Sequence, residues 1–295
     1  MEKIKRLKQV FKRENIDGYL IPKNDEFFGE YVPNHNDRLD YISNFSGSYG
    51  FSLILRDRNY LFVDGRYILQ AINQSGKNFK IINIPKKMPN NILKNKKLLI
   101  GFDPKLYTKK TLNTFFSKNN CKFKPLDNNL IDYIWKRKNE KNKNKFYSLP
   151  RHSVGNYYEY KINKIVSNLK KKGADFQFIT SSENNAWLLN IRGKDSSYTP
   201  IPYSYVLINK NKNIKFFCDL KKISLSFKKK LKKIKFLNIE SIDKNLLEIY
   251  KKKFIIDKNT CSYHFENIIL KNNKILNFQD PIYNLKAIKN KKEIE

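Results

Sequence analysis

Residues 31–71, YVPNHNDRLDYISNFSGSYGFSLILRDRNYLFVDGRYILQA, form the least random part of a chain that is otherwise rich in Lys and Asn. Within this stretch, Gly47 and Gly50 flank Ser48 and Tyr49. Two glycines at this spacing predict a turn that needs either a positive φ or a close approach of the backbone. We therefore expect a tight turn in the middle of the stretch.

A hairpin and a capped helix are predicted to follow this turn. Phe51–Leu55 and Asn59–Val63 are apolar runs of strand length, joined by a short polar turn. Asp64 then occupies an N-cap position, where its carboxylate can accept the free N–H group of Arg66 or Tyr67. The helix itself is indicated by apolar residues at helical spacing: Ile68, Leu69 and Ile72.

Helices and short strands alternate along the first half of the chain. Ile4–Glu14 is a basic amphipathic helix, and Tyr19–Pro22 is a short buried strand. Residues 31–40 read as a polar loop. Further strands are expected at Phe79–Ile84, Leu98–Phe102 and Cys121–Leu126, and further helices at Thr108–Ser117 and Asn128–Trp135.

A charged run divides the chain. Lys136–Lys145 (KRKNEKNKNK) has no apolar residue and predicts a solvated linker, and Pro150 favours an extended connection beyond it. We place the boundaries as a first domain at 1–137, a linker at 138–156, a second domain at 157–285 and a final segment at 286–295.

The pattern of the first domain repeats after the linker. Tyr160–Lys172 is again an amphipathic helix that ends at an Asp, here Asp175, and a strand and a hairpin follow. Asn190–Gly193 echoes Asn44–Gly47 at a spacing of roughly 150 residues. The sequence therefore predicts an internal duplication with changes in loop length.

Two motifs resemble a known family. The first is Arg-x-x-Tyr-x-x-x-Phe-Ser-Gly-Ser-x-Gly, a hairpin and Val-Asp-Gly-Arg-Tyr, with positions Arg38, Tyr41, Phe45, Gly47, Ser48, Gly50, Asp64, Gly65, Arg66 and Tyr67. The second is Ala-Trp-Leu-Leu-Asn-Ile-Arg-Gly, which contributes Trp187, Asn190, Arg192 and Gly193. Together they resemble the first two domains of the three-domain Xaa-Pro aminopeptidases (aminopeptidase P).

The resemblance implies an α/β fold. It consists of two tandem creatinase N-terminal (ribonuclease-H-like) domains, each a mixed β-sheet flanked by helices. Asp280–Ile282 and Lys286–Asn290 are similar to the family's approach to its catalytic domain. Residues 286–295 are accordingly expected to begin the helix that leads into that domain.

The resemblance also implies a function. In the family, a third domain holds two divalent metal ions, often manganese, and a metal-bridging hydroxide attacks the carbonyl of a Xaa-Pro bond. This chain then resembles the non-catalytic N-terminal part of a cytoplasmic metallo-aminopeptidase that acts on peptides with proline at position two. The catalytic domain is expected to be missing from it, so the chain itself binds no cofactor; a homodimer is expected.

Roles for single residues follow from the same resemblance. Arg38, Tyr41, Phe45, Gly47, Ser48 and Gly50 become candidates for the substrate cleft or for a dimer contact. A Gly-Ser-Tyr-Gly turn can bring backbone N–H groups close to a peptide, and Arg38 can hold a carboxylate. The alternative is that these residues form core and turn. We expect structural roles for Asp64, Gly65, Arg66, Tyr67, Trp187, Asn190, Arg192 and Gly193, with Asp64 and Arg66 as a cap and an ion pair.

No catalytic or metal-binding motif is found in the sequence. The histidines belong to no H-x-x-x-H or H-E-x-x-H pattern: His35, His152 and His264. The three cysteines are far apart and indicate free thiols. Ser46 and Ser48 do not match the G-x-S-x-G nucleophile elbow. We therefore expect no metal site and no nucleophile in this chain.

The net charge of +33 leaves an alternative function open, which is a stand-alone basic module that binds nucleic acid or a protein partner. No RNA-recognition, KH, zinc-finger or helix-turn-helix signature supports specific binding, so we expect only non-specific, salt-sensitive attraction to polyanions. An independent enzyme on a ribonuclease-H-like sheet would need clustered carboxylates, which are not evident. No apolar run suits a membrane span or a signal peptide, which predicts a cytoplasmic protein.

Overall fold

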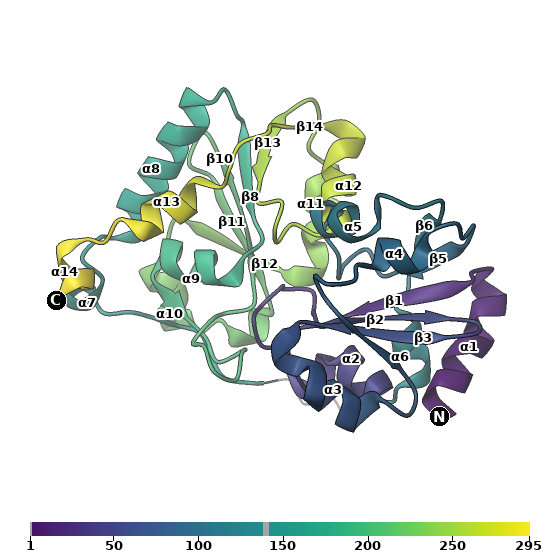
Figure 1. The fold of residues 1–295 in the computed structure, drawn as a ribbon. Coiled ribbons are helices and arrows are strands. Elements are labelled where there is room, and N and C mark those ends of the chain that lie inside the picture. Colours follow the sequence, from purple (N-terminus) through teal and green to yellow (C-terminus); the bar gives the residue numbers. More distant parts are fainter. Residues whose placement is uncertain (1, 138–141) are drawn as a thin grey trace. The chain divides into compact units, whose positions relative to one another are not determined.

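The computed structural model describes residues 2–137 and 142–295, which form two compact units (Figure 1). The N-terminal unit comprises residues 2–26 and 30–137, and the C-terminal unit comprises residues 27–29 and 142–295. Each unit has a six-stranded sheet and a hydrophobic core of its own. None of the helices in the described ranges combines the length and the apolar character that a membrane crossing requires.

The sheet of the N-terminal unit is mixed and has the order β4-β3-β2-β1-β5-β6. β1 pairs antiparallel with β2 and parallel with β5, so that Leu20 lies opposite Leu53 on one side and Phe102 on the other. β2 and β3 form the predicted hairpin. At the edges of the sheet, β4 pairs parallel with β3, and β6 pairs parallel with β5. The strands are β1 (Gly18–Pro22), β2 (Phe51–Leu55), β3 (Asn59–Val63), β4 (Lys80–Asn83), β5 (Leu99–Phe102) and β6 (Lys122–Pro125).

The helices of this unit connect and cover the strands. They are α1 (Glu2–Glu14), α2 (Arg38–Ser43), α3 (Ile68–Ser75), α4 (Pro89–Leu93), α5 (Lys109–Phe116) and α6 (Leu130–Ile134), with 3-10 turns η1 (Asn34–Asn36) and η2 (Gly65–Tyr67). Leu7 and Phe11 of α1 are fully buried in the same core cluster as Ile131 of α6, as amphipathic spacing on α1 predicts.

One detail of the predicted N-terminal unit is wrong, and one of its helices, α4, was not predicted. The expected polar loop over residues 31–40 ends early, because α2 begins at Arg38. Asp37 caps this helix by accepting the Asp40 N–H at 3.0 Å. The helix indicated by Ile68, Leu69 and Ile72 is present as α3, in which Leu69 and Ile72 are 77% and 50% exposed. The polar-loop prediction failed because α2 has only six residues, too few for a periodic pattern to be recognised among polar neighbours.

The sheet of the C-terminal unit has the order β12-β11-β10-β8-β13-β14. Its strand directions repeat those of the first sheet, with β8 antiparallel to β10 and parallel to β13. The strands are β8 (Phe176–Ile179), β10 (Tyr205–Asn209), β11 (Ile214–Cys218), β12 (Ile234–Asn238), β13 (Lys253–Ile256) and β14 (Lys274–Ile275).

Both faces of this second sheet are buried. Side chains of β10 alternate between two core clusters: Val206 packs in the cluster of α8 and α9, and Leu207 packs in the cluster of α11 and α12. The helices are α7 (Arg151–Val154), α8 (Tyr158–Lys171), α9 (Ser182–Leu189), α10 (Leu225–Lys230), α11 (Ile242–Leu247), α12 (Tyr263–Asn272), α13 (Pro281–Ala287) and α14 (Lys291–Ile294), with η3 (Leu220–Lys222) and η4 (Ile239–Ser241).

Part of the sequence expected to be a linker is regular structure. Residues 138–141 lie outside the described residues. Beyond them, β7 (Tyr147–Ser148) pairs antiparallel with β9 (Ile191–Arg192), and α7 follows. Phe146 is 3% exposed and belongs to the core of the C-terminal unit, which explains why this segment is ordered against it.

In each unit, the aspartate just before the central strand makes the same hydrogen bonds to the neighbouring parallel strand. Asp17 bonds to Leu99 through both its backbone N–H and its carboxylate, which accepts the Leu99 N–H at 2.9 Å. Asp175 does the same with Lys253, at 3.0 Å. Its carboxylate also pairs with Lys210 at 2.8 Å. This repetition, together with the identical strand order, is what an internal duplication produces.

Removing this carboxylate should destabilise the protein. We expect Asp175→Ala to lower the free energy of unfolding by about 0.5–1.5 kcal/mol, because it removes the carboxylate that accepts the Lys253 N–H and pairs with Lys210. The measurement is urea denaturation followed by tryptophan fluorescence. Asp57→Ala, in the exposed hairpin turn of the N-terminal unit, is the control and should change the value by less than about 0.5 kcal/mol. Equal effects of the two substitutions would contradict this assignment.

Candidate functional site

The first motif forms a closely packed turn. Phe45 is fully buried, and a Cβ placed on Gly47 would lie only 2.3 Å from its Cζ and 2.9 Å from Cδ1 of Tyr67. A Cβ on Gly50 would come within 2.8 Å of the Phe62 carbonyl oxygen. The glycines therefore allow the backbone to approach a buried ring and a neighbouring strand.

Hydrogen bonds fasten the turn to the start of α3. The hydroxyl groups of Ser48 and Tyr67 are 2.7 Å apart, and the Tyr67 ring meets Phe45 edge-on at 5.8 Å between centroids. Asp64 accepts the Arg66 N–H at 2.9 Å and pairs with its guanidinium at 2.7 Å, so the predicted cap and ion pair are confirmed. Gly65 opens η2 and is exposed.

Arg38 is buried and already holds carboxylates of its own unit. Its guanidinium donates to Asp132 at 2.9 and 3.1 Å and to Glu26 at 2.9 Å. Burial acts to lower the pKa of Arg38, but these two carboxylates outweigh it and raise that pKa. Asp132 also pairs with Arg137. The network ties α2 to α6, which leaves Arg38 only 2% exposed.

Tyr41 joins the same connection between α2 and α6. Its hydroxyl donates to the Ile134 carbonyl at 2.9 Å, and its ring stacks on Trp135 at 4.7 Å. The ammonium of Lys3 lies 4.5 Å from the Tyr41 ring centroid. Like Arg38, Tyr41 therefore has partners within the N-terminal unit.

The accessible groups around the glycine turn lie between its buried residues and on α3. Tyr49 is 44% exposed, and α3 carries exposed Leu69 and Ile72. Ser46 is exposed as well, and its hydroxyl accepts the side-chain amides of Gln70 and Gln74 at 3.0 and 2.9 Å. The sequence motif indicates the turn, but it does not reveal which of its residues face outward.

The second motif closes α9 in the C-terminal unit. Asn190 ends this helix with φ of 54°, a left-handed conformation that Asn tolerates better than most residues. Asn44 ends α2 in the same way, with φ of 61°. Arg192 donates to the Ala186 carbonyl at 3.1 Å, and a Cβ on Gly193 would lie 2.8 Å from the Cα of Pro202.

Lys161 of α8 is a buried lysine that the sequence analysis missed. Its ammonium donates to the Trp187 carbonyl at 2.7 Å and to Oδ1 of Asn190 at 2.6 Å, and lies 4.2 Å from the Trp187 ring centroid. Burial lowers the pKa of Lys161 to about 8, Glu293 opposes this shift and Arg192 adds to it. The available signal was its spacing from Tyr158 and Ile165, which places it on the apolar stripe of α8.

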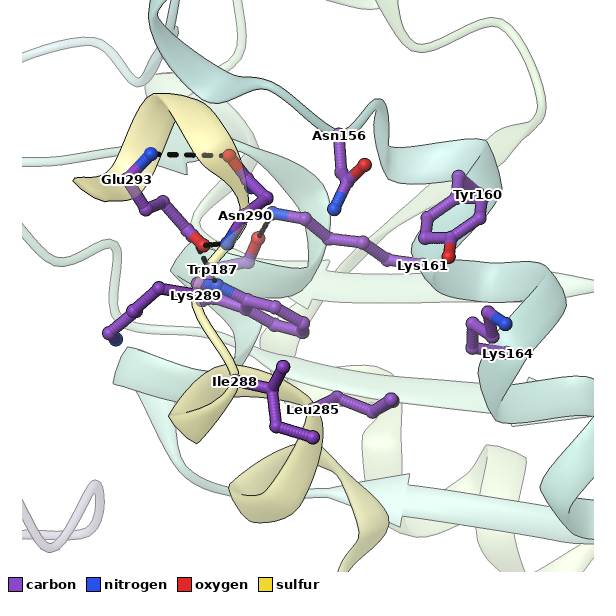
Figure 2. Close-up of a pocket in the computed structure, with 10 residues that line it drawn as sticks. All are labelled: Asn156, Tyr160, Lys161, Lys164, Trp187, Leu285, Ile288, Lys289, Asn290 and Glu293. Carbon is purple, nitrogen blue, oxygen red and sulfur yellow. Dashed lines mark hydrogen bonds between the residues drawn. The ribbon is translucent and has the colours of Figure 1, made fainter. Parts of the chain in front are cut away.

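Lys161 lies in the wall of a hollow of about 320 Å³ (Figure 2). The hollow is lined by basic, aromatic and apolar side chains, among them Tyr160, Lys161, Lys164, Trp187, Ile288 and Glu293. Figure 2 shows Glu293 reaching back from α14 to the indole of Trp187, with Nε1 to Oε1 at 3.1 Å. The second motif contributes Trp187 to this concave, partly apolar site, and α8 and residues 285–293 supply most of the rest.

The histidines and cysteines are scattered. Nε2 of His264 lies 2.8 Å from Oδ2 of Asp243, and Cys218 and Cys261 are buried free thiols. Burial raises the pKa of the Cys218 thiol to about 12. Over residues 2–137 and 142–295, no group of three or more His, Cys, Asp or Glu side chains is arranged to hold a metal ion.

Comparison with known proteins assigns both units to one family. Residues 3–133 and 136–293 each match a family model described as the Creatinase/Prolidase N-terminal domain. The chain belongs to the creatinase/prolidase N-terminal domain family. The two six-stranded sheets with repeated order are thus two copies of a creatinase/prolidase N-terminal domain, as the resemblance implied.

Its curated relatives include Xaa-Pro aminopeptidases. A probable Xaa-Pro aminopeptidase P of Laccaria bicolor is 29% identical over 311 residues, covering 100% of this chain and 48% of the relative. The Xaa-Pro aminopeptidase ApepP of Drosophila melanogaster is 30% identical over 297 residues, covering 95% and 48%. The chain therefore spans about half the length of the curated relatives it matches.

A solved structure shares the fold. The X-prolyl aminopeptidase of Caenorhabditis elegans matches with a TM-score of 0.91 at 23% identity, covering 99% of this chain and 52% of that one. It is described as a cytosolic enzyme with a di-nuclear active site. The two creatinase/prolidase N-terminal domains of the present chain thus share the fold of the corresponding part of that structure.

The surroundings of Gly47 and Gly65 predict different effects on stability when each is replaced by Ala. Gly47→Ala should lower the free energy of unfolding by about 1–3 kcal/mol, because the added methyl group collides with a buried ring. Gly65→Ala is the matched control: nothing lies within 4 Å of its Cβ position, and the change should be neutral or slightly stabilising. Urea denaturation of both variants measures this difference, and a neutral Gly47→Ala would show that the turn is loose.

The buried ammonium predicts a particular pH dependence. The pKa of Lys161 is about 8 in the folded protein, below its ordinary value of 10.5, so the unfolded chain binds more protons between these values. Stability should therefore rise with pH across this window, by on the order of 1–3 kcal/mol relative to Lys161→Met. Urea denaturation at pH 7 and pH 10 measures it. Lys164→Met, which changes an exposed lysine on the same helix, is the control. If the difference in free energy of unfolding between the unsubstituted protein and Lys161→Met were the same at both pH values, the shifted pKa would be contradicted.

Proposed function

We propose that this chain is the non-catalytic N-terminal portion of a metallo-aminopeptidase that removes the N-terminal residue from peptides with proline at position two. The observation that carries this proposal is the alignment of the whole chain with a Xaa-Pro aminopeptidase P, of which it covers only 48%. The two-domain fold shared with the nematode X-prolyl aminopeptidase supports it. The proposed division is a first domain at 1–137 and a second domain that takes in β7, α7 and α14 as well as the residues 157–285 expected from the sequence.

In this proposal the metal chemistry belongs to the part of the relatives that lies beyond the matched half. The nematode relative is described as di-nuclear, which supports two metal ions for the complete enzyme, and manganese is the proposed metal. The described residues of this chain do not fit such a pair, since they offer no cluster of three or more metal-ligating side chains. Its own contribution is the shape of the two domains.

We assign the first motif a supporting role at the substrate cleft or at a dimer contact. Arg38, Tyr41, Phe45, Gly47, Ser48 and Gly50 have partners within their own unit, so they hold the turn in place. The exposed Tyr49 and the apolar Leu69 and Ile72 of α3 are the groups able to contact a peptide or a second copy. Cytoplasmic localisation is part of the proposal and is supported by the cytosolic nematode relative. Weak, salt-sensitive binding to polyanions is expected from the charge of +33.

The test isolates the natural polypeptide with an antibody raised against this chain. Its mass should be about twice the 35.2 kDa of the 295 residues, since the relatives are about twice as long. It should release the first residue of an Ala-Pro peptide and not of an Ala-Ala peptide, and a chelator should abolish this activity until Mn²⁺ is restored. The 295-residue chain alone should release nothing in Mn²⁺. Release by this chain alone, or inactivity of the natural polypeptide, would overturn the proposal.

A further inference from the structure

The short helix α14 is attached to the C-terminal unit at several points. Four residues are too few for a helix to be stable alone. Asn290 and Glu293 form a capping box at its start, in which Glu293 accepts the Asn290 N–H at 3.0 Å. Nδ2 of Asn290 also donates to the Val154 carbonyl of α7 at 3.2 Å. These contacts connect the beginning of the C-terminal unit with its last helix.

The contact with α7 depends on a glycine. Gly155 ends α7 with φ of 64°, and a Cβ at this position would lie 2.2 Å from Oδ1 of Asn290. A side chain is therefore excluded both by the left-handed backbone and by the neighbouring amide. The site is shaped to receive Asn290, and with it the turn that starts α14.

Glu293 makes the attachment to α9. Its Oε1 accepts the indole N–H of Trp187 at 3.1 Å, and its other oxygen remains in the capping box (Figure 2). The same indole lies 4.2 Å from the Lys161 ammonium. One aromatic ring thus contacts both a buried cation and the carboxylate of the last helix.

The electrostatics favour this arrangement. Lys161 is 3% exposed, and it donates hydrogen bonds to a carbonyl and to an amide oxygen, neither of which carries a net charge. A buried ammonium is destabilised unless an anion is near. Glu293 supplies the negative charge that favours the protonated form. The other titratable or charged groups around Lys161 are Tyr160, Lys164, Arg192 and Lys289.

We propose that Glu293 is a positioning residue that latches α14 to α9. Its carboxylate is bound by the Trp187 indole and attracted by the Lys161 ammonium, and together they fix the direction in which the chain leaves the C-terminal unit. Resting on the proposed function, this latch sets how the catalytic part is joined to the second domain. The latch does not depend on a ligand bound in the hollow, since Glu293 of the chain itself supplies the carboxylate.

The test compares two glutamates of the last turn in the 295-residue chain. Glu293→Gln removes the charge, while Gln can still serve in a capping box. Glu295→Gln, whose partner is Lys292, removes the same charge outside the latch. The Lys161 ammonium is titrated by NMR on chain labelled with ¹⁵N-lysine, and Trp187 fluorescence is read in a Trp135→Phe background, which leaves a single tryptophan.

Glu293→Gln should lower the pKa of Lys161 by on the order of half a unit or more and should change the Trp187 emission, whereas Glu295→Gln should do neither. An unchanged Lys161 titration in Glu293→Gln, an equal shift in Glu295→Gln or an unaltered Trp187 emission would each overturn the latch. If Glu293 served only as a helix cap, Glu293→Gln would alter the Trp187 emission and leave the Lys161 titration unchanged. Since no peptidase assay is involved, inactivity of the natural polypeptide would overturn the proposed function and leave this result unaffected.

Discussion

The architecture of both units depends on one aspartate beside the first strand. This strand lies between an antiparallel hairpin and a parallel strand, so its start must satisfy backbone groups on two sides. Asp17 and Asp175 do so by bonding the parallel strand through main chain and carboxylate, while their carbonyls accept N–H groups of Arg56 and Lys210 at the hairpin turn. Both sheets share a strand order, and both keep this junction.

The two family motifs do different physical work. The motif of the first domain packs a glycine turn on a buried phenylalanine and secures it to α3 through Ser48 and Tyr67. The motif of the second domain ends a helix with a left-handed Asn190, whose side chain then accepts from a buried lysine. The first motif holds a loop at the surface of its domain. The second builds a polar centre to which the last helix of the chain is attached.

The sequence allowed most of the fold to be predicted where patterns were long or chemically specific. The helix at α1, the hairpin of β2 and β3 and the cap at Asp64 were confirmed, since each depends on residues close together in the chain. The helix α2 was missed because six residues with two buried apolar positions lack a readable period. Leu69 and Ile72 have helical spacing, yet spacing alone cannot tell an inward from an outward face.

The sequence by itself determined the family, the duplication and the residues that shape the turns, because these follow from local motifs and from their repetition. The tertiary structure alone decided that Arg38 is taken up by Asp132 and Glu26, and that Lys161, Trp187 and Glu293 meet around one hollow. The reason is physical: the charge state of a buried ammonium and the partner of a buried guanidinium are set by groups distant in sequence. Only the packing of helices brings those groups within a few ångströms.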